Sequence, residues 1–161
     1  MDLMAQLHRK LAYNAWANRE VFRSVHAARN VPARAAAVLA HIAAAEWLWL
    51  SRLGQPVPVV PVWPEWTPPE RELQFAQLSH AWQSYLSGLS ASSLSREITY
   101  RNSKGETWSN SVADVLTHVP LHSAYHRGQV TTLLRAGGGE VAYSDYIECV
   151  RRGHLSQGWP S

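Results

Sequence analysis

Apolar residues recur at spacings of three and four over four long stretches of the chain, with polar and charged residues between them. That periodicity is typical of amphipathic helices that bury one face. It predicts helices over residues 3–28, 33–53 and 69–90, and a fourth that begins at one of residues 109–111 and runs to about 136. Glycine commonly ends a helix, and Gly54 and Gly137 follow the second and fourth stretches. The pattern therefore predicts an all-α fold, a four-helix bundle.

The segments that connect these helices differ in composition. Residues 54–69 contain six prolines, which exclude a regular helix and predict a long extended connection, held to the bundle by Trp63 and Trp66. Residues 97–108 place two β-prone runs around the turn sequence Asn-Ser-Lys-Gly, which predicts a small hairpin between helices three and four. A short helix is expected at 144–152.

Composition narrows the class of protein. A chain of 161 residues that is 46% hydrophobic and 17% charged can form one domain spanning 1–161. No apolar run reaches the roughly 18 residues of a membrane span, the N-terminus lacks a signal-peptide pattern, and a lone Cys149 excludes an internal disulfide framework. We therefore expect a cytoplasmic protein without a membrane partner. Although the net charge is +3, the basic residues are scattered, which argues against a nucleic-acid partner.

Histidine is the most informative residue type. Of eight histidines, three follow one another at four-residue intervals in the fourth predicted helix: His118, His122 and His126. Each step of four advances about 40° around a helix, so neighbours in this series share a face and can bind one metal ion together. No glutamate adjoins the first histidine of either pair, so the His-Glu-x-x-His protease motif is absent. Pro120 is expected to kink this helix or to lie within a turn of its start.

A metal site needs a further ligand from another helix, and the second predicted helix offers His41. It lies in an apolar face with Val38 and Ala45, where an imidazole must find a polar partner or bind a ligand. Three neutral imidazoles with open coordination positions are typical of catalytic zinc, nickel or ferrous iron sites. The remaining histidines are expected not to bind metal: His8, His26 and His154 at the surface and His80 partly buried.

Four segments, in order between residues 3 and 147, resemble the DinB/YfiT-like family. They are Tyr13-Asn14-Ala15-Trp16-Ala17-Asn18, the stretch His41–Leu50, Tyr100-Arg101-Asn102 with Gly105, and His118-Val119-x-x-His122-x-x-x-His126-Arg127-Gly128-Gln129. The last is the most specific. The family is named after damage-inducible bacterial genes and is distinct from the translesion polymerase of similar name.

The resemblance implies an up-down-down-up bundle, a homodimer and a divalent metal bound by three histidines. Carried over by motif, the ligands are His41, His122 and His126, because the ligand pair of the family directly precedes Arg-Gly-Gln. His118 belongs to the same series and is the rival for either His122 or His126. His118 then becomes a group beside the ligands or an acid/base, oriented by Asp114 one turn earlier.

Members of the wider superfamily act as thiol S-transferases, and one group is a thiol-dependent isomerase. The resemblance thus implies a metal-dependent stress or detoxification enzyme that joins a low-molecular-weight thiol to an electrophile, with hydrolysis as a variant. The second hypothesis is a non-catalytic metal- or ligand-binding bundle, because Glu46 should point away from the ligands and few other acid/base groups lie nearby. Arg127 could bind an anionic substrate group, or point to solvent or to another helix. The loop residues Trp63, Trp66 and Trp108 could line a pocket entrance.

Overall fold

A computed structural model describes residues 1–155 and 159, and it confirms the helical fold with a hairpin between the third and fourth helices. The four long helices are α1 (Leu3–Ala27), α2 (Ala33–Arg52), α3 (Pro68–Ser87) and α4 (Val112–Ala136). The shorter elements are η1 (Ala91–Ser95), β1 (Glu97–Arg101), β2 (Thr107–Ser111) and α5 (Tyr146–Arg151). The third helix ends before the predicted residue 90, because the serine-rich segment after Gly88 forms the separate 3-10 helix η1.

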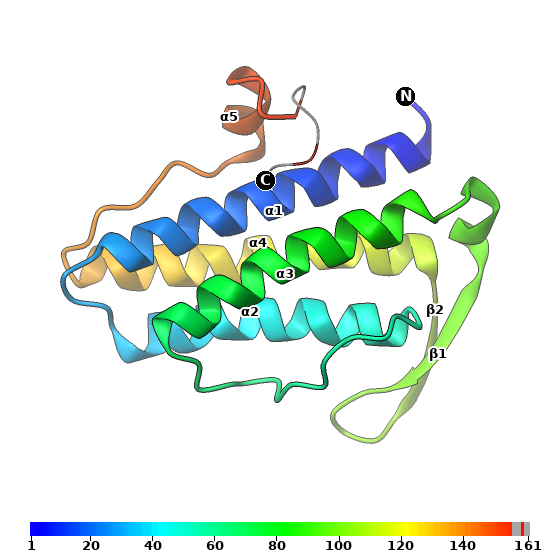
Figure 1. The fold of residues 1–161 in the computed structure, drawn as a ribbon, viewed down its shortest axis with the longest axis horizontal. Helices are drawn as coiled ribbons and strands as arrows, with labels where there is room; N and C mark the ends of the chain where they lie inside the picture. The colour runs from blue at the N-terminus through cyan, green and yellow to red at the C-terminus, as the bar shows by residue number, and fades with distance from the viewer. Residues whose placement is uncertain (156–158, 160–161) are drawn as a thin grey trace.

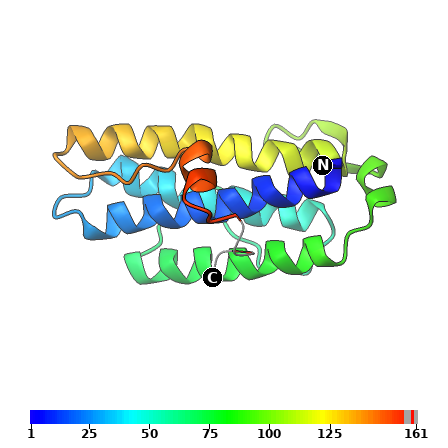
Figure 2. The ribbon, with the colours of Figure 1, turned by 90° about the horizontal axis from the view of Figure 1, so that it is seen from above.

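The direction of the helices is up-down-down-up, as the family resemblance implied. Figure 1 shows α1 and α4 running one way along the bundle and α2 and α3 the other. Residues 54–67 connect α2 to α3. Because these two helices run parallel, the connection carries the chain back along the length of the bundle (Figure 1). Helix α4 packs against α1 and α2, and α3 packs against the same two helices from the opposite side (Figure 2).

The hairpin follows from its turn sequence. Strands β1 and β2 are antiparallel, with Tyr100 opposite Trp108. The side-chain oxygen of Asn102 accepts hydrogen bonds from the backbone N–H groups of Lys104 and Glu106, and Gly105 has a φ of +79°, which favours glycine. The Tyr100 ring contacts Trp49 of α2 edge-on, so the hairpin is attached to the helix that carries His41.

Local sequence also fixes where α4 begins. The Ser111 hydroxyl accepts a hydrogen bond from the backbone N–H of Asp114 and donates one to the Asp114 carboxylate. This is an N-terminal cap that stabilises the first turn. Helix α4 then continues through Pro120, so the alternative that this proline lies within a turn of the helix start is wrong.

The core is continuous with the helix interfaces that hold the histidines. Buried alanines of α2, among them Ala43 and Ala44, let neighbouring backbones approach closely, and leucines such as Leu50 and Leu116 are fully buried between the helices. Polar positions face outward along most of each helix. None of the helices among the described residues has a stretch long and apolar enough to cross a bilayer.

Candidate metal centre

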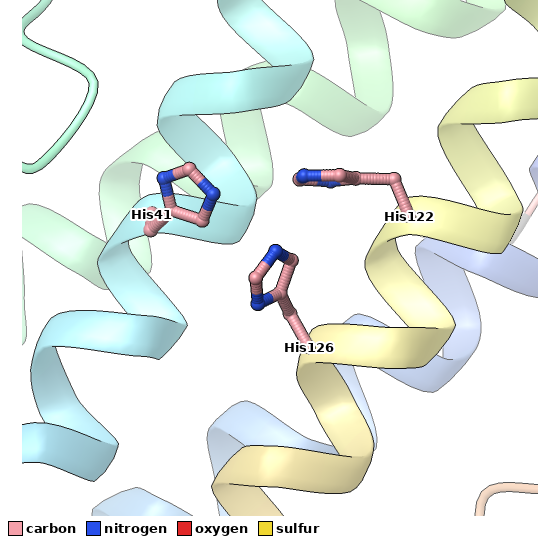
Figure 3. Close-up of side chains that lie close together, drawn as sticks. All are labelled: His41, His122 and His126. Carbon is pink, nitrogen blue, oxygen red and sulfur yellow. The ribbon is translucent and has the colours of Figure 1, made fainter.

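The structure brings His41, His122 and His126 together, and we call them the three-histidine group. One ring nitrogen of each lies within 4.8 Å of the others. His122 and His126 lie one turn apart on α4 and face His41 on α2, as Figure 3 shows. The ring centroid of His41 is 5.4 Å from that of His122 and 4.7 Å from that of His126. Two helices thus supply three imidazoles to one place.

The spacing of the nitrogens suits one cation after a small adjustment. With zinc–nitrogen bonds of about 2.0–2.1 Å, neighbouring nitrogens of a tetrahedral site are about 3.4 Å apart. A triangle of nitrogens with sides of at most 4.8 Å needs each ring nitrogen to move inward by no more than about 0.8 Å. The donor set of three imidazoles is one that zinc, nickel and ferrous iron accept. The residues present therefore fit a divalent metal.

His41 is held in the tautomer that a metal ligand needs. Its Nδ1 lies 2.8 Å from the carbonyl oxygen of Val62, and because a carbonyl only accepts, Nδ1 must carry the hydrogen and Nε2 the lone pair. The indole of Trp63 stacks on the imidazole at 4.0 Å between centroids, and the Arg34 guanidinium lies over that indole. The proline-rich connection therefore both orients and covers His41, in agreement with the expectation that Trp63 attaches it to the bundle.

His126 has an equivalent partner on its own helix. Its Nδ1 lies 2.9 Å from the side-chain oxygen of Gln129, so Nδ1 donates and Nε2 is left with the lone pair. A hydrogen bond from the second ring nitrogen to a carbonyl or carboxylate is the usual support of a metal-ligating histidine. Two of the three imidazoles have that support here.

Protonation of His122 and His41 is disfavoured near neutral pH. Burial, followed by the neighbouring imidazoles of His126, His41 and His118, lowers the pKa of His122 to about 4. Burial is also the main cause of the lowered pKa of His41, although its hydrogen bond to Val62 opposes the shift. Neutral imidazoles keep their lone pairs available, as a metal site requires.

These shifts predict how stability depends on pH when metal is removed. Unfolded, His122 titrates at its ordinary pKa of 6.5, and folded at about 4, so the unfolded chain binds the extra proton between these values. The free energy of unfolding should therefore fall as the pH drops from about 6.5 to 4, by about 1 kcal/mol per pH unit or less because the ring is partly exposed. Urea unfolding of metal-free protein at pH 7, 6 and 5 measures this slope. His122→Asn should flatten it, and an unchanged slope in that variant would contradict the assignment.

His118 lies beside the three-histidine group without joining it. Its ring contacts Trp49 edge-on at 5.0 Å and lies 5.4 Å from the ring of His122, and burial lowers its pKa, with a smaller effect from the nearby Arg52. The expectation that Asp114 orients His118 is wrong, because the Asp114 carboxylate is used in the cap with Ser111.

A buried polar network lies behind the histidines, and the sequence analysis did not predict it. The Glu46 carboxylate is 3% exposed and accepts four hydrogen bonds, from Asn14, Asn18, Ser123 and Trp82, at 2.7–3.0 Å. Burial raises the pKa of Glu46, and the four donors oppose that shift. The prediction that Glu46 points away from the ligands is confirmed. The signal in the sequence that could have revealed the network is that Asn14, Asn18 and Glu46 stand at helical spacing from apolar residues of their own helices.

Arg127 completes the network and does not reach solvent. Its Nη1 donates to the side-chain oxygens of both Asn14 and Asn18, at 2.7 and 2.6 Å, and its Nη2 contacts the Tyr13 hydroxyl at 3.4 Å. Each asparagine therefore donates to Glu46 and accepts from Arg127. Because the guanidinium is 3% exposed, the alternative in which Arg127 binds a substrate anion is wrong, and it points to the neighbouring helix α1. We call Asn14, Asn18, Glu46, Trp82, Ser123 and Arg127 the Glu46 network.

The remaining residues singled out in the sequence lie away from the three-histidine group. Cys149 is fully buried, and burial raises its pKa to about 11, so its thiol is unreactive. His80 is exposed rather than partly buried, and His154 stacks on Trp16 instead of standing free at the surface. Trp108 is exposed on the hairpin, whereas Trp66 packs against the core.

Comparison with known proteins supports the family resemblance. The model of the DinB family matches residues 4–152. The chain belongs to the DinB family. Among curated proteins, the DinB family member "Protein DinB" of Bacillus subtilis (strain 168) is 25% identical over 152 residues, which cover 83% of this chain and 87% of that protein. No solved structure matches the chain. In this DinB family member, the three-histidine group could hold a metal ion.

Proposed function

We propose that this protein binds a divalent metal, zinc, nickel or ferrous iron, through His41, His122 and His126, and uses it to transfer a low-molecular-weight thiol to an electrophile. The observation that carries the proposal is the convergence of three ring nitrogens within 4.8 Å, with Nδ1 of His41 and of His126 occupied by other partners. A site with three protein ligands leaves a coordination position for a reactant, which is typical of catalytic rather than structural metal sites. Such an ion, when bound, lowers the pKa of a thiol and holds its sulfur as an anion.

The space for an electrophile lies next to His126, on the side of its Gln129 partner, and none of the three imidazoles lines it. A groove between α2 and α4 has a volume of about 600 Å³, and its lining includes Arg34, Val38, Tyr125, Gly128 and Gln129. We call it the α2–α4 groove. Its lining residue Gln129 binds His126, and the ring of Tyr125 contacts His126 edge-on. A Cβ at Gly128 would meet nothing within 4 Å, so the groove is open at that point.

In the proposed reaction the thiol sulfur forms a bond to the electrophilic carbon. The thiol proton is released to water, and the leaving group departs from that carbon with its bonding electron pair. The thiol must be a cosubstrate, because Cys149 is fully buried and its pKa is raised. The chain's own contribution is to position the imidazoles and to shape the α2–α4 groove.

Protein purified without a polyhistidine tag tests this proposal. Metal-free enzyme would be loaded with zinc, nickel or ferrous iron and mixed with coenzyme A, cysteine, bacillithiol or mycothiol and a chlorodinitrobenzene electrophile, and thiol consumption followed. We expect metal-dependent consumption with at least one thiol, abolished in His41→Ala. Consumption that does not depend on metal, or none with any pair, would contradict the transferase proposal.

The second candidate is a metal-binding bundle without catalysis. The observation in its favour is that Glu46 and Asp114, the carboxylates nearest to the histidines in sequence, are both engaged elsewhere, one in the core and one in the cap. Stoichiometric metal binding without thiol turnover would support it. The homodimer that the family resemblance implies stays a prediction, which sedimentation velocity tests.

A further inference from the structure

The Glu46 network touches all four long helices from inside the bundle. Asn14 and Asn18 lie on α1, Glu46 on α2, Trp82 on α3, and Ser123 and Arg127 on α4. A buried carboxylate and a buried guanidinium are here bridged by two asparagine side chains. Removing either charge leaves the other without compensation in a dry interior, where unpaired charge is unfavourable. The network therefore permits few alternative arrangements of the helices.

Its two members on α4 directly follow the two candidate ligands of that helix. Ser123 is next to His122, and Arg127 is next to His126. Successive residues of an α-helix point about 100° apart, so one face of α4 presents the imidazoles to His41 while an adjacent face presents Ser123 and Arg127 to the network. Any rotation of α4 that moved the imidazoles would also move these two side chains.

Helix α4 is attached to Glu46 of α2 both by a direct hydrogen bond and by a bridge through two asparagines of α1. The Ser123 hydroxyl donates to the Glu46 carboxylate at 3.0 Å, and Arg127, one turn later, reaches the same carboxylate through Asn14 and Asn18. Two attachments one turn apart fix both the rotation of α4 and its position along the axis. His41 lies on the same helix as Glu46, five residues earlier.

We infer that Glu46, with Ser123 and Arg127, is a positioning residue for the metal centre: it holds α4 against α2 so that the three imidazoles converge, without itself touching the ion. The inference rests on the proposed function. A metal ligand held slightly out of place loses affinity, and disturbing a side chain that orients ligands typically costs about 10–100-fold in metal affinity. Polar contacts on the adjacent face of α4 should therefore change the affinity and the spectrum of the bound metal.

The test compares cobalt binding in the wild-type chain, Glu46→Gln and Ser123→Ala, by titration of metal-free protein and by the visible absorption spectrum of bound cobalt. Glu46→Gln keeps the size of the side chain but turns one of its acceptors into a donor facing other donors. We expect it to lower cobalt affinity about 10–100-fold and to alter the spectrum. Ser123→Ala, which removes a single donor, should shift both readouts in the same direction by a smaller amount.

Leu86→Ala is the matched control for stability. Leu86 is a buried residue of α3 outside the Glu46 network, so its loss destabilises the core without touching α4 through polar contacts. It should leave the cobalt spectrum unchanged and the affinity within about threefold, well short of the loss expected for a disturbed ligand support. A spectrum altered as much in Leu86→Ala as in Glu46→Gln would show a general stability effect and overturn the inference.

Two failures remain distinguishable. If wild-type protein binds no cobalt, the proposed metal site fails and the positioning role with it. If wild-type protein binds cobalt and both network variants bind it with the same affinity and spectrum, the metal site stands and the positioning role is refuted. Should Glu46→Gln not fold, Ser123→Ala decides the question by the same two readouts.

Discussion

Replacing His41 by alanine should reduce the affinity for zinc by well over 100-fold. Loss of a group that merely supports a ligand costs about 10–100-fold, and His41 is the contribution of α2 to the three-histidine group. The two imidazoles left on α4 would bind as an ordinary His-x-x-x-His pair. Competition titration with a chromophoric chelator, on protein without a polyhistidine tag, measures the change.

His118→Ala is the matched control for that experiment. It also removes an imidazole next to His122, but one that lies outside the three-histidine group. We expect its zinc affinity to stay within a few-fold of wild type, less than the loss typical of a ligand's supporting partner. If His118→Ala lost as much affinity as His41→Ala, His118 would replace His122 or His126 as a ligand, and the assignment of that pair would be wrong.

Replacing Arg127 by methionine should lower the free energy of unfolding by about 3–5 kcal/mol, which is typical of breaking a buried ion pair from one side. The substitution removes the cation that Asn14 and Asn18 bridge to the buried Glu46, and it takes the Arg127 donor away from the side-chain oxygens of both asparagines. Urea unfolding at neutral pH, followed by circular dichroism, measures the loss.

Arg135→Met controls for the loss of a positive charge from the same helix. Arg135 lies in the last turn of α4 and is exposed, and exposed substitutions usually change stability by no more than about 0.5 kcal/mol. A loss in Arg127→Met of under about 1 kcal/mol would mean that the bridged pair is weaker than a buried pair should be. The Glu46 network would then hold α4 against α2 too weakly to set the positions of the imidazoles.

The helices were predictable because their signals are local. Hydrophobic periodicity, the glycines at helix ends and the Asn-Ser-Lys-Gly turn each act over a few residues, and the element boundaries follow them closely. The His122 and His126 pair was predictable for the same reason, since a four-residue interval on one helix fixes a shared face. The direction of the helices and the choice of this pair over His118 came from the family resemblance.

The supports of the site could not be predicted, because they depend on contacts between distant segments. Nothing local to His41 indicates that the Val62 carbonyl accepts its Nδ1 hydrogen or that Trp63 stacks on its ring. Asn18 follows Leu7 and Leu11 at the helical spacing of three and four residues, and a polar residue in such an apolar series is a clue to a buried polar partner. That partner, Glu46, could be identified only once the helices were packed together.

The most direct test of the central claim is a crystal structure of the protein grown with zinc, with the ion located by its anomalous scattering. We expect one ion between α2 and α4, about 2.0–2.1 Å from Nε2 of His41, Nε2 of His126 and one nitrogen of His122. An ion bound by α4 alone, with Nε2 of His41 too far away to bind it, would contradict this assignment of the ligands.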